Sequence, residues 1–466
     1  MSPFLQVSNL SIKSNDVTLI NNISFSLTNE NPLIILGQTG SGKSLLLKFI
    51  MGTLDPKLHV TGQFFISGNE IPYKQRSSLW GKTLSILPQE PSQTLSPLMK
   101  GHAQISEVYR YVNKDERSLA QKKAHQSLEN YGLGEHANKR PYELSGGMAQ
   151  RLAMCITSAG HSDLLLVDEP SKGLDIARRD EMITHLKHRA KDGGLCVVTH
   201  DIEVARGLGG SMIVIQKGEL VEQGDTQIIL GSPTHSYTKT LLASVPERWA
   251  QPHHQHKTSA PILSIRNLTL HRGNRCLFTN LNLRLHAGEV IGVVGKSGSG
   301  KSSLGDVILG LINTYSGTIE RFSYEMKKPH WLKIFQDPIA SLPSQVTLGQ
   351  LLDDLILCHQ INRQRIPDMM ETLRLSPELL HLKPHQASGG ELQRFSILRT
   401  LLLDPIFLFA DEPTSRLDPV VAKEVSTMLI TLAKKQGCGV LIVSHDPKLI
   451  QSLSDSVINI EDYHLS

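Results

Sequence analysis

Four short motifs occur twice along this chain, each time in the same order. The pairs are GQTGSGKS (37–44) with GKSGSGKS (295–302), LSGGMAQR (144–151) with ASGGELQR (387–394), LLLVDEP (164–170) with FLFADEP (407–413), and VVTHD (197–201) with IVSHD (442–446). Repetition of this kind constrains the fold more than any other feature, because each copy must form the same unit. The sequence therefore predicts two homologous domains.

We expect a first domain over 1–250, a linker over 251–260 and a second domain over 261–466. The chain length of 466 residues suits this division, since a domain takes roughly 100–200 residues. The linker sequence QPHHQHKTSA is polar, and a segment of that length can span at most about 35 Å. A solvated linker is the favoured interpretation. The alternative is a metal site formed by His253, His254 and His256.

Composition and charge argue against several function classes. Lys plus Arg number 48 and Asp plus Glu 44, and a net charge of +4 is too small to indicate a nucleic-acid partner. The five cysteines lie far apart without a C-x-x-C motif, so we expect neither a disulfide scaffold nor a Cys-based metal site. The N-terminal sequence is not typical of a signal peptide. No apolar run approaches the ~18–20 residues that span a bilayer, so we expect a soluble protein that reaches a membrane through a partner.

Short apolar runs alternate with helical stretches in both halves of the chain. Helical patterns follow at Leu45–Met51 and Leu304–Leu311. Buried strands that alternate with helices are typical of a mostly parallel sheet. We therefore predict the α/β fold class. The predicted strands are Leu33–Leu36, Leu164–Val167, Cys196–Thr199, Met212–Ile215, Val290–Val294, Ile406–Ala410 and Val440–Ser444.

The first motif of each copy fits a phosphate-binding loop. The pattern G-x-x-x-x-G-K-[ST] between a strand and a helix turns backbone N–H groups toward the β- and γ-phosphates of a nucleotide. The lysine adds positive charge, and the hydroxyl reaches Mg²⁺. One copy alone could be a Gly-rich turn, but two copies in the same setting favour the triphosphate loop. The predicted binding residues are Gly37, Gln38, Thr39, Gly40, Ser41, Gly42, Lys43 and Ser44, and Gly295, Lys296, Ser297, Gly298, Ser299, Gly300, Lys301 and Ser302.

Carboxylates end the apolar strand of the third motif. Asp168 and Asp411 are placed to hold Mg²⁺ through water. Glu169 and Glu412, one residue further, are placed to polarise the attacking water. Acidic residues that merely end a strand are the alternative, and the phosphate loop in each copy makes that alternative weak.

Two further polar positions complete each predicted site. His200 and His445 end later strands, where they could contact the γ-phosphate or fix the attacking water, although a single histidine at a strand end is usually structural. Gln89 and Gln336 could touch Mg²⁺ and water. The candidate metal ligands are thus Ser44, Gln89, Asp168, Ser302, Gln336 and Asp411.

These motifs in this order resemble the ATP-binding cassette family over nearly the whole chain. The distinguishing mark of that family is an SGG motif at a helix start, here Ser145, Gly146 and Gly147, and Ser388, Gly389 and Gly390. The resemblance implies ATP hydrolysis with ATP and Mg²⁺ as ligands. It also implies two P-loop NTPase domains, each with a RecA-like, mostly parallel sheet and a helical subdomain. In the family, the SGG motif of one domain closes on the nucleotide held by the other.

The sequence departs from the family pattern in three places, one of which is SKGLD (171–175), a looser match than TSRLD (414–418) to the loop after the third motif. Met148 and Glu391 stand where the SGG motif usually continues with Gln. The aromatic residue that stacks on the base is absent, and Arg272 near that place could stack instead. Because Glu391 brings negative charge toward a triphosphate, we expect the site on Lys43 to close less tightly than the site on Lys301.

A narrower resemblance points to the importer branch for oligopeptides, dipeptides and nickel. It rests on PQEPSQTLSP (88–97), FQDPIASLPS (335–344) and the tail SPTHSYTKTLLASVP (232–246) of the first domain. That tail contains no Cys, so no iron–sulfur cluster is expected. The resemblance implies an ATPase at the cytoplasmic face of the inner membrane that energises import of peptides, nickel or metal chelates. The implied partners are two integral membrane permease subunits and, indirectly, an extracytoplasmic solute-binding protein, without nucleic acid.

Two other functions stay open at this point. One is a tandem ATPase for vitamin or cobalt uptake of the energy-coupling type. The other is a soluble ATPase that acts on ribosomes or DNA, a class that usually has a long charged linker or zinc insertions. For the importer, we expect the segments after Gln89 and Gln336 to face the permeases, and we expect substitutions at Leu95 or Leu342 to lower transport more than nucleotide binding.

Overall fold

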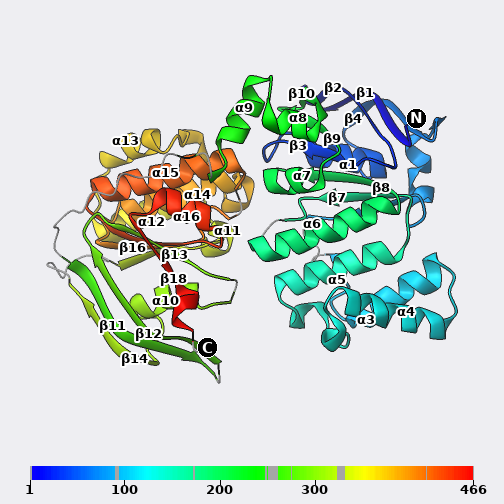
Figure 1. The fold of residues 1–466 in the computed structure, drawn as a ribbon. Helices are drawn as coiled ribbons and strands as arrows, with labels where there is room; N and C mark the ends of the chain where they lie inside the picture. The colour runs from blue at the N-terminus through cyan, green and yellow to red at the C-terminus, as the bar shows by residue number, and fades with distance from the viewer. Residues whose placement is uncertain are drawn as a thin grey trace. The chain divides into compact units, whose positions relative to one another are not determined.

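The computed structural model divides into two compact units, Met1–Leu242 and Ala243–Ser466, drawn from blue to green and from green to red in Figure 1. The predicted linker over 251–260 lies outside the described residues. Among the described residues, no helix combines the length and apolar character needed to cross a bilayer. The structure describes residues 3–89, 94–171, 174–246, 249, 261–273, 275–296, 298–322, 331–415 and 417–464.

The first unit is built on a six-stranded sheet in the order β10-β9-β3-β8-β7-β6. Every neighbouring pair is parallel except β10 and β9. The central strands β3 and β8 are buried throughout, which explains their unbroken apolar sequence. The strands are β3 (Leu33–Leu36), β6 (Leu84–Leu87), β7 (Leu164–Asp168), β8 (Gly194–Thr199), β9 (Ser211–Gln216) and β10 (Glu219–Asp225).

A second, antiparallel sheet in the order β2-β1-β4-β5 packs on this core. Along β1, buried apolar residues alternate with more exposed residues, as expected for a half-buried strand. Helix α1 shares one hydrophobic cluster with both sheets. The strands are β1 (Leu5–Ser14), β2 (Val17–Leu27), β4 (His59–Ile66) and β5 (Asn69–Glu70).

Helices α3, α4 and α5 form a separate group in the first unit, away from β1 and β2 (Figure 1). Helices α6 and α7 pack near the central sheet, and α8 and α9 follow its last strand. The helices are α1 (Lys43–Met51), α3 (Gly101–Glu107), α4 (Arg117–Asn130), α5 (Gly146–Ala159), α6 (Ile176–Lys191), α7 (Ile202–Leu208), α8 (Thr226–Gly231) and α9 (Ser236–Ala243).

The second unit repeats this plan with a five-stranded parallel sheet, β15-β16-β17-β13-β18, and an antiparallel sheet, β12-β11-β14. One hydrophobic cluster lies between the two sheets and α10, and another joins the parallel sheet to the later helices. The strands are β11 (Pro261–Arg272), β12 (Arg275–His286), β13 (Val290–Val294), β14 (Tyr315–Arg321), β15 (Trp331–Ile334), β16 (Phe407–Asp411), β17 (Gly439–Val443) and β18 (Ser456–Asn459).

The second unit also contains α-helices beside its sheets. They are α10 (Lys301–Ile308), α11 (Pro338–Ser341), α12 (Leu348–His359), α13 (Arg365–Thr372), α14 (Gly389–Leu401), α15 (Pro419–Lys435) and α16 (Pro447–Leu453). Short turns of other helix types are η1 (Tyr73–Leu79), η2 (Val108–Val112), η3 (Gly134–His136), η4 (Pro141–Glu143), η6 (Pro377–His381), η7 (Pro384–Gln386) and η8 (Ile460–Tyr463).

The predicted fold class is confirmed, because each unit has a mostly parallel α/β core and a group of helices beside it. The predicted strands at Leu33–Leu36 and Val290–Val294 match β3 and β13 in both bounds. The other predicted strands differ by one or two residues at one end or at both ends. The apolar runs in the sequence do not predict the strands of the antiparallel sheets, because these strands mix apolar and polar residues.

Candidate active sites

Both phosphate loops run from the end of a central strand to the start of a helix, from β3 to α1 and from β13 to α10. Gly40 and Gly42 have φ of 79° and 100°, in the region that favours glycine. A side chain at Gly42 would also meet Ile20 at 2.5 Å. Gly298 and Gly300 repeat this conformation, with φ of 77° and 103°.

Glycine also leaves the helix starts open to an anion. Gly42 is the N-cap of α1, Gly300 is the N-cap of α10, and neither offers a side-chain acceptor. The N–H groups of a first helical turn have no partner within the helix. An anion at these two positions would therefore meet both hydrogen-bond donors and the positive end of a helix dipole.

A buried lysine sits inside each loop. Lys43 Nζ donates to the carbonyls of Gly37 and Gln38, each at 2.8 Å. Lys301 Nζ donates to the carbonyls of Gly295 at 2.7 Å and Lys296 at 2.8 Å. The loop backbone thus holds each ammonium group inside the loop, beside the place where a phosphate would bind.

The loop hydroxyls meet the aspartates that end β7 and β16. Ser44 Oγ lies 3.4 Å from Asp168 Oδ1, and Ser302 Oγ donates to Asp411 Oδ1 at 2.9 Å. Burial raises the pKa of Asp168 and outweighs the opposing hydrogen bond from Ser44. Hydroxyl and carboxylate oxygens are the hard donors that Mg²⁺ prefers, so the residues present fit a magnesium ion.

The glutamates that follow have a left-handed backbone, with φ of 48° at Glu169 and 45° at Glu412. Non-glycine residues in this conformation are strained, and such strain is common at functional sites. The adjacent strand holds each backbone in place, because the N–H groups of the two glutamates donate to Val198 O at 2.9 Å and Val443 O at 3.0 Å.

Each glutamate lies beside a histidine, and Glu169 also lies beside a lysine. Glu169 is 6% exposed, and its Oε1 lies 3.5 Å from Lys43 Nζ. Its Oε2 accepts from His200 N at 3.2 Å and lies 2.8 Å from His200 Nδ1, without the alignment of a hydrogen bond. In the second unit, Glu412 Oε2 lies 3.3 Å from His445 Nδ1.

These contacts keep the glutamates charged. Burial alone would raise the pKa of Glu169, but the His200 ring and the Lys43 ammonium outweigh it and hold that pKa below its usual value. Burial would likewise lower the pKa of His200, yet its contact with Glu169 raises the pKa. Glu412 and His445 show the same pair of opposite shifts for the same reasons. A charged glutamate can accept a proton from water.

The two predicted glutamines differ in their contacts. Gln336 Nε2 donates to Glu412 Oε2 at 2.9 Å and lies 3.5 Å from Ser415 Oγ. Gln89 lies just past β6 in the same relation to its sheet. Within the described part of the chain, however, Gln89 makes no corresponding hydrogen bond to Glu169.

The SGG motifs begin helices α5 and α14, as the resemblance implies, but their caps differ. Ser145 Oγ accepts from Met148 N at 3.4 Å. Ser388 forms a capping box, because its Oγ accepts from Glu391 N at 3.3 Å and its N–H donates to Glu391 Oε2 at 2.9 Å. The Ser388 hydroxyl also donates to Glu391 Oε2 at 2.6 Å. The Ser388 hydroxyl is the main reason that the pKa of Glu391 is lowered. The Glu391 carboxylate is thus turned back onto its own helix cap.

Two residues that sequence reasoning missed hold equivalent amides of the phosphate loops. Gln38 N donates to Tyr237 Oη at 2.9 Å, and Lys296 N donates to Glu461 Oε1 at 2.9 Å. Tyr237 belongs to α9, in the tail SPTHSYTKT, and Glu461 belongs to η8. The tail sequence supports the resemblance to the importer branch, but no local pattern connects it with a loop about 200 residues earlier.

Leu95 and Leu342, in the two segments that we expect to face the permeases, have buried side chains. They are only 6% and 7% exposed, and Leu342 belongs to the core cluster of the later helices. Apolar side chains at a segment end can turn inward as easily as outward, which the sequence alone does not decide. Leu98 and Ile339, in the same two segments, are exposed by 80% and 49%.

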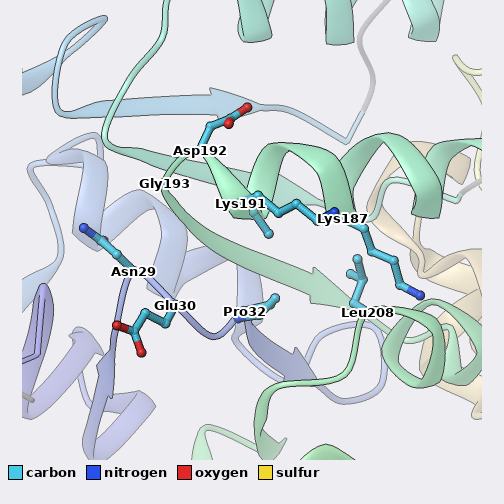
Figure 2. A pocket seen from close by; sticks show the side chains of 9 residues that line it. Asn29, Glu30, Pro32, Lys187, Lys191, Asp192, Gly193 and Leu208 are labelled. Atoms are coloured by element: carbon cyan, nitrogen blue, oxygen red, sulfur yellow. The ribbon is translucent and has the colours of Figure 1, made fainter.

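A surface hollow of about 680 Å³ lies elsewhere in the first unit. Figure 2 shows it between the turn before β3, with Asn29 and Glu30, and the end of α6, with Lys187 and Lys191. None of the predicted site residues lines it. Its charges are mixed, so it offers no single ligand chemistry.

Each unit therefore brings its predicted lysine, serine, aspartate, glutamate and histidine together at the carboxyl end of its parallel sheet. Ser297 lies outside the described residues. The ABC transporter family model matches residues 20–172 and 278–415, once in each unit. The chain belongs to the ABC transporter family. It is an ATP-binding protein and an ATPase, because ABC ATP-binding proteins hydrolyse ATP.

Relatives of this ABC protein match it along nearly its whole length. The peptidoglycan transport ATP-binding protein YejF of Agrobacterium fabrum is 28% identical over 98% of this chain and 90% of its own. The glutathione import ATP-binding protein GsiA of Escherichia coli is also 28% identical, over 97% of this chain and 84% of its own. Tandem cassettes in one chain are thus shared with these two proteins.

Solved structures show the same tandem fold. The archaeal ribosome recycling factor aABCE1, in complex with the stalk protein aP1, has a TM-score of 0.66 with 20% identity over 94% of this chain and 84% of its own. The model of ribosome-bound archaeal Pelota and ABCE1 contains a match with a TM-score of 0.70 and 21% identity, over 96% of this chain and 76% of that one. At this identity the likeness concerns the fold alone.

Proposed function

We propose that this ABC ATPase energises a membrane importer, with both nucleotide-binding domains in one chain. The observation that carries the proposal is the end-to-end similarity to two transport ATPases, one named for peptidoglycan and one for glutathione. Both of those solutes contain peptide bonds. We therefore favour a peptide-containing solute over nickel or a metal chelate.

The proposed partners are two integral membrane permease subunits, and indirectly an extracytoplasmic solute-binding protein. The chain would then work at the cytoplasmic face of the membrane. Leu98 and Ile339 provide exposed apolar side chains in the two segments expected to meet the permeases. Buried apolar contact of this kind stabilises protein interfaces.

The proposed chemistry uses the same residues in both units. The loop amides and Lys43 bind the phosphates of ATP, while Ser44 and Asp168 hold Mg²⁺. When bound, that ion neutralises charge on the phosphate oxygens. Glu169 accepts the proton of the attacking water, and His200 keeps its carboxylate ionised and in place. Lys301, Ser302, Asp411, Glu412 and His445 take these roles in the second unit, with Gln336 beside Glu412.

The experiment is co-purification of the chain with two candidate permease subunits from the same genome, followed by ATPase assays in proteoliposomes. We expect a stable complex whose ATPase activity rises with the solute-loaded binding protein. Leu98→Asp and Ile339→Asp should weaken the complex. Val17→Asp is the matched control, because Val17 is 62% exposed on the β1–β2 hairpin.

Other outcomes would favour the alternative functions. Co-sedimentation with ribosomes and no membrane complex would favour a soluble cassette ATPase and contradict the importer. A complex with vitamin- or cobalt-uptake membrane subunits that needs no extracytoplasmic binding protein would favour the energy-coupling type.

A further inference from the structure

The two proposed metal positions differ in the charges around their aspartates. In the second unit, Lys333 Nζ lies 3.3 Å from Asp411 Oδ2 and 2.8 Å from Asp306 Oδ1. The other oxygen of Asp411 accepts from Ser302. Both carboxylate oxygens of Asp411 therefore have a partner, and one partner carries a positive charge.

Lys333 is fixed rather than loosely placed. Its side chain is 12% exposed, and its ammonium lies 5.1 Å from the centre of the Phe409 ring. The same ammonium also forms an ion pair with Asp306. A charge with this little exposure is screened by water and salt much less than a surface charge.

The first unit has different residues at the equivalent places. Lys333 pairs with Phe409, two residues before Asp411, and Ile86 pairs with Leu166, two residues before Asp168. Ile86 is thus the counterpart of Lys333. Counting five residues from each loop lysine, the counterpart of Asp306 is Lys48.

Lys48 does not replace Lys333 in the first unit. Lys48 is exposed on α1, and Lys48 and Lys43 attract Asp168 only from beyond ion-pair distance, so within the described residues no cation forms an ion pair with Asp168. Its described polar contact is the 3.4 Å one from Ser44. Among the described residues, no ammonium group in ion-pair contact with Asp168 therefore competes with a metal ion.

We propose that Lys333 is a resident cation that weakens divalent-metal binding at the Lys301 site and makes nucleotide binding there less dependent on Mg²⁺ than at the Lys43 site. The ammonium offsets part of the Asp411 charge and repels a second cation nearby. Asp306 shares this ammonium, which Asp411 and the Phe409 ring also contact. The inference rests on the proposed function of both sites as Mg-ATP sites.

The test measures binding at one site at a time in the full-length chain. Lys43→Ala removes the first site and leaves the Lys301 site, and Lys301→Ala does the reverse. For each, the affinity for the fluorescent analogue mant-ATP is measured in EDTA and in saturating Mg²⁺. We expect the ratio of the two affinities to be about tenfold smaller at the Lys301 site, as one poorly screened charge at a few ångströms allows.

Lys333→Met should remove the difference, because methionine keeps an unbranched side chain without the charge. In the Lys43→Ala background, we expect the Mg²⁺ dependence to rise about tenfold, and Mn²⁺ to bind more tightly in electron paramagnetic resonance titrations with ADP. The double change Asp306→Asn with Lys333→Met should behave alike, and it leaves no unpaired carboxylate if the single variant is unstable. Asp306→Asn alone keeps the Lys333 ammonium, so mant-ATP binding at the Lys301 site should keep its weak dependence on Mg²⁺.

The reciprocal transfer provides an independent readout. Lys48→Asp with Ile86→Lys, in the Lys301→Ala background, should lower the Mg²⁺ dependence of the Lys43 site. If Lys333→Met and the double variant fold and bind mant-ATP but keep the original Mg²⁺ ratio, the inference is wrong. If the unaltered Lys301 site binds no mant-ATP at all, the proposed function of that site fails instead.

Discussion

Glu169 and Glu412 combine burial, a strained backbone and a lowered pKa. Backbone strain and the burial of a charge each cost free energy of folding, and the nearby histidine and lysine charges offset the cost of burial, which is why the pKa is lowered. A carboxylate held ionised in a buried position suits proton acceptance. At the scale of single residues, the site is therefore organised around these two glutamates.

We predict that Glu169→Gln combined with Glu412→Gln slows ATP hydrolysis by about 10²–10⁴-fold while ATP still binds. Glutamine keeps the size of the side chain but cannot accept a proton. Steady-state ATPase assays and equilibrium ATP binding of the double variant check this. Asp180→Asn, on the exposed part of α6, serves as the control. Wild-type turnover in the double variant would contradict the assignment of the two glutamates.

The histidine–glutamate contacts predict how stability depends on pH. The raised pKa of His200 and of His445 stabilises the folded chain below the unfolded value of about 6.5, and this contribution is lost as pH rises through the folded value. The lowered pKa of Glu169 and Glu412 stabilises the chain above about pH 4.3 and is lost only as pH falls further. We expect the nucleotide-free chain to melt at a lower temperature near pH 9 than near pH 6.

Differential scanning calorimetry measures this change. His200→Gln with His445→Gln should flatten the dependence between those two pH values, because glutamine does not titrate. The exposed pair His381→Gln and His385→Gln is the comparison. An unchanged slope in the His200 and His445 variant would refute the account.

Among the structural elements, the tail helix α9 contacts the phosphate loop of the first unit, although the two lie far apart in the sequence. Tyr237 is 7% exposed, and its hydroxyl accepts from the Gln38 amide of the phosphate loop. In the second unit, Glu461 of η8 takes the equivalent amide. Different elements thus stabilise the two loops.

We predict that Tyr237→Phe weakens ATP binding at the Lys43 site by roughly 3- to 10-fold. The ring stays packed, while the loop amide loses one hydrogen bond, which is worth about 0.5–1.5 kcal/mol. Binding is measured in the Lys301→Ala background. Tyr111→Phe is the control, since Tyr111 is 59% exposed. Equal losses in both variants, or a drop in melting temperature without a change in affinity, would argue against a loop-holding role.

For the whole molecule, the family pattern places the SGG motif of one domain against the nucleotide of the other. The capping box of Ser388 adds a reason for the expected difference between the two sites. Its hydroxyl already donates to Glu391, whereas Ser145 has Met148 at that place. A nucleotide approaching Ser388 would have to compete with a carboxylate for that hydroxyl.

We therefore predict that the site closed by Ser388 needs more ATP to close than the site closed by Ser145. Cysteine pairs at Ser41 with Gly389, and at Ser299 with Gly146, are cross-linked at rising ATP and low protein concentration. The bonds should form within single chains, and Glu391→Gln should shift the first pair toward the second. Bonds only between chains would refute the pairing, and easier closure at Ser41 would refute the asymmetry.

The sequence by itself determined the duplication, the α/β class, the two phosphate loops and the residues around them. These features follow from short segments in which glycine, lysine and carboxylates must stand at fixed spacing, so their pattern is local. The predicted strands matched for the same reason, since a fully buried strand is an unbroken apolar run. The half-buried antiparallel strands, with mixed sequences, were not among the strands predicted from apolar runs.

The tertiary structure alone decided which distant residues complete the sites. Tyr237 and Glu461 reach loops that are 199 and 165 positions away in sequence, and Lys333 meets Asp411 across two neighbouring strands. It also decided that Leu95 and Leu342 are buried while Leu98 and Ile339 are exposed. Such contacts depend on how strands and helices pack, and one apolar or charged residue has no periodicity that shows which way its side chain points.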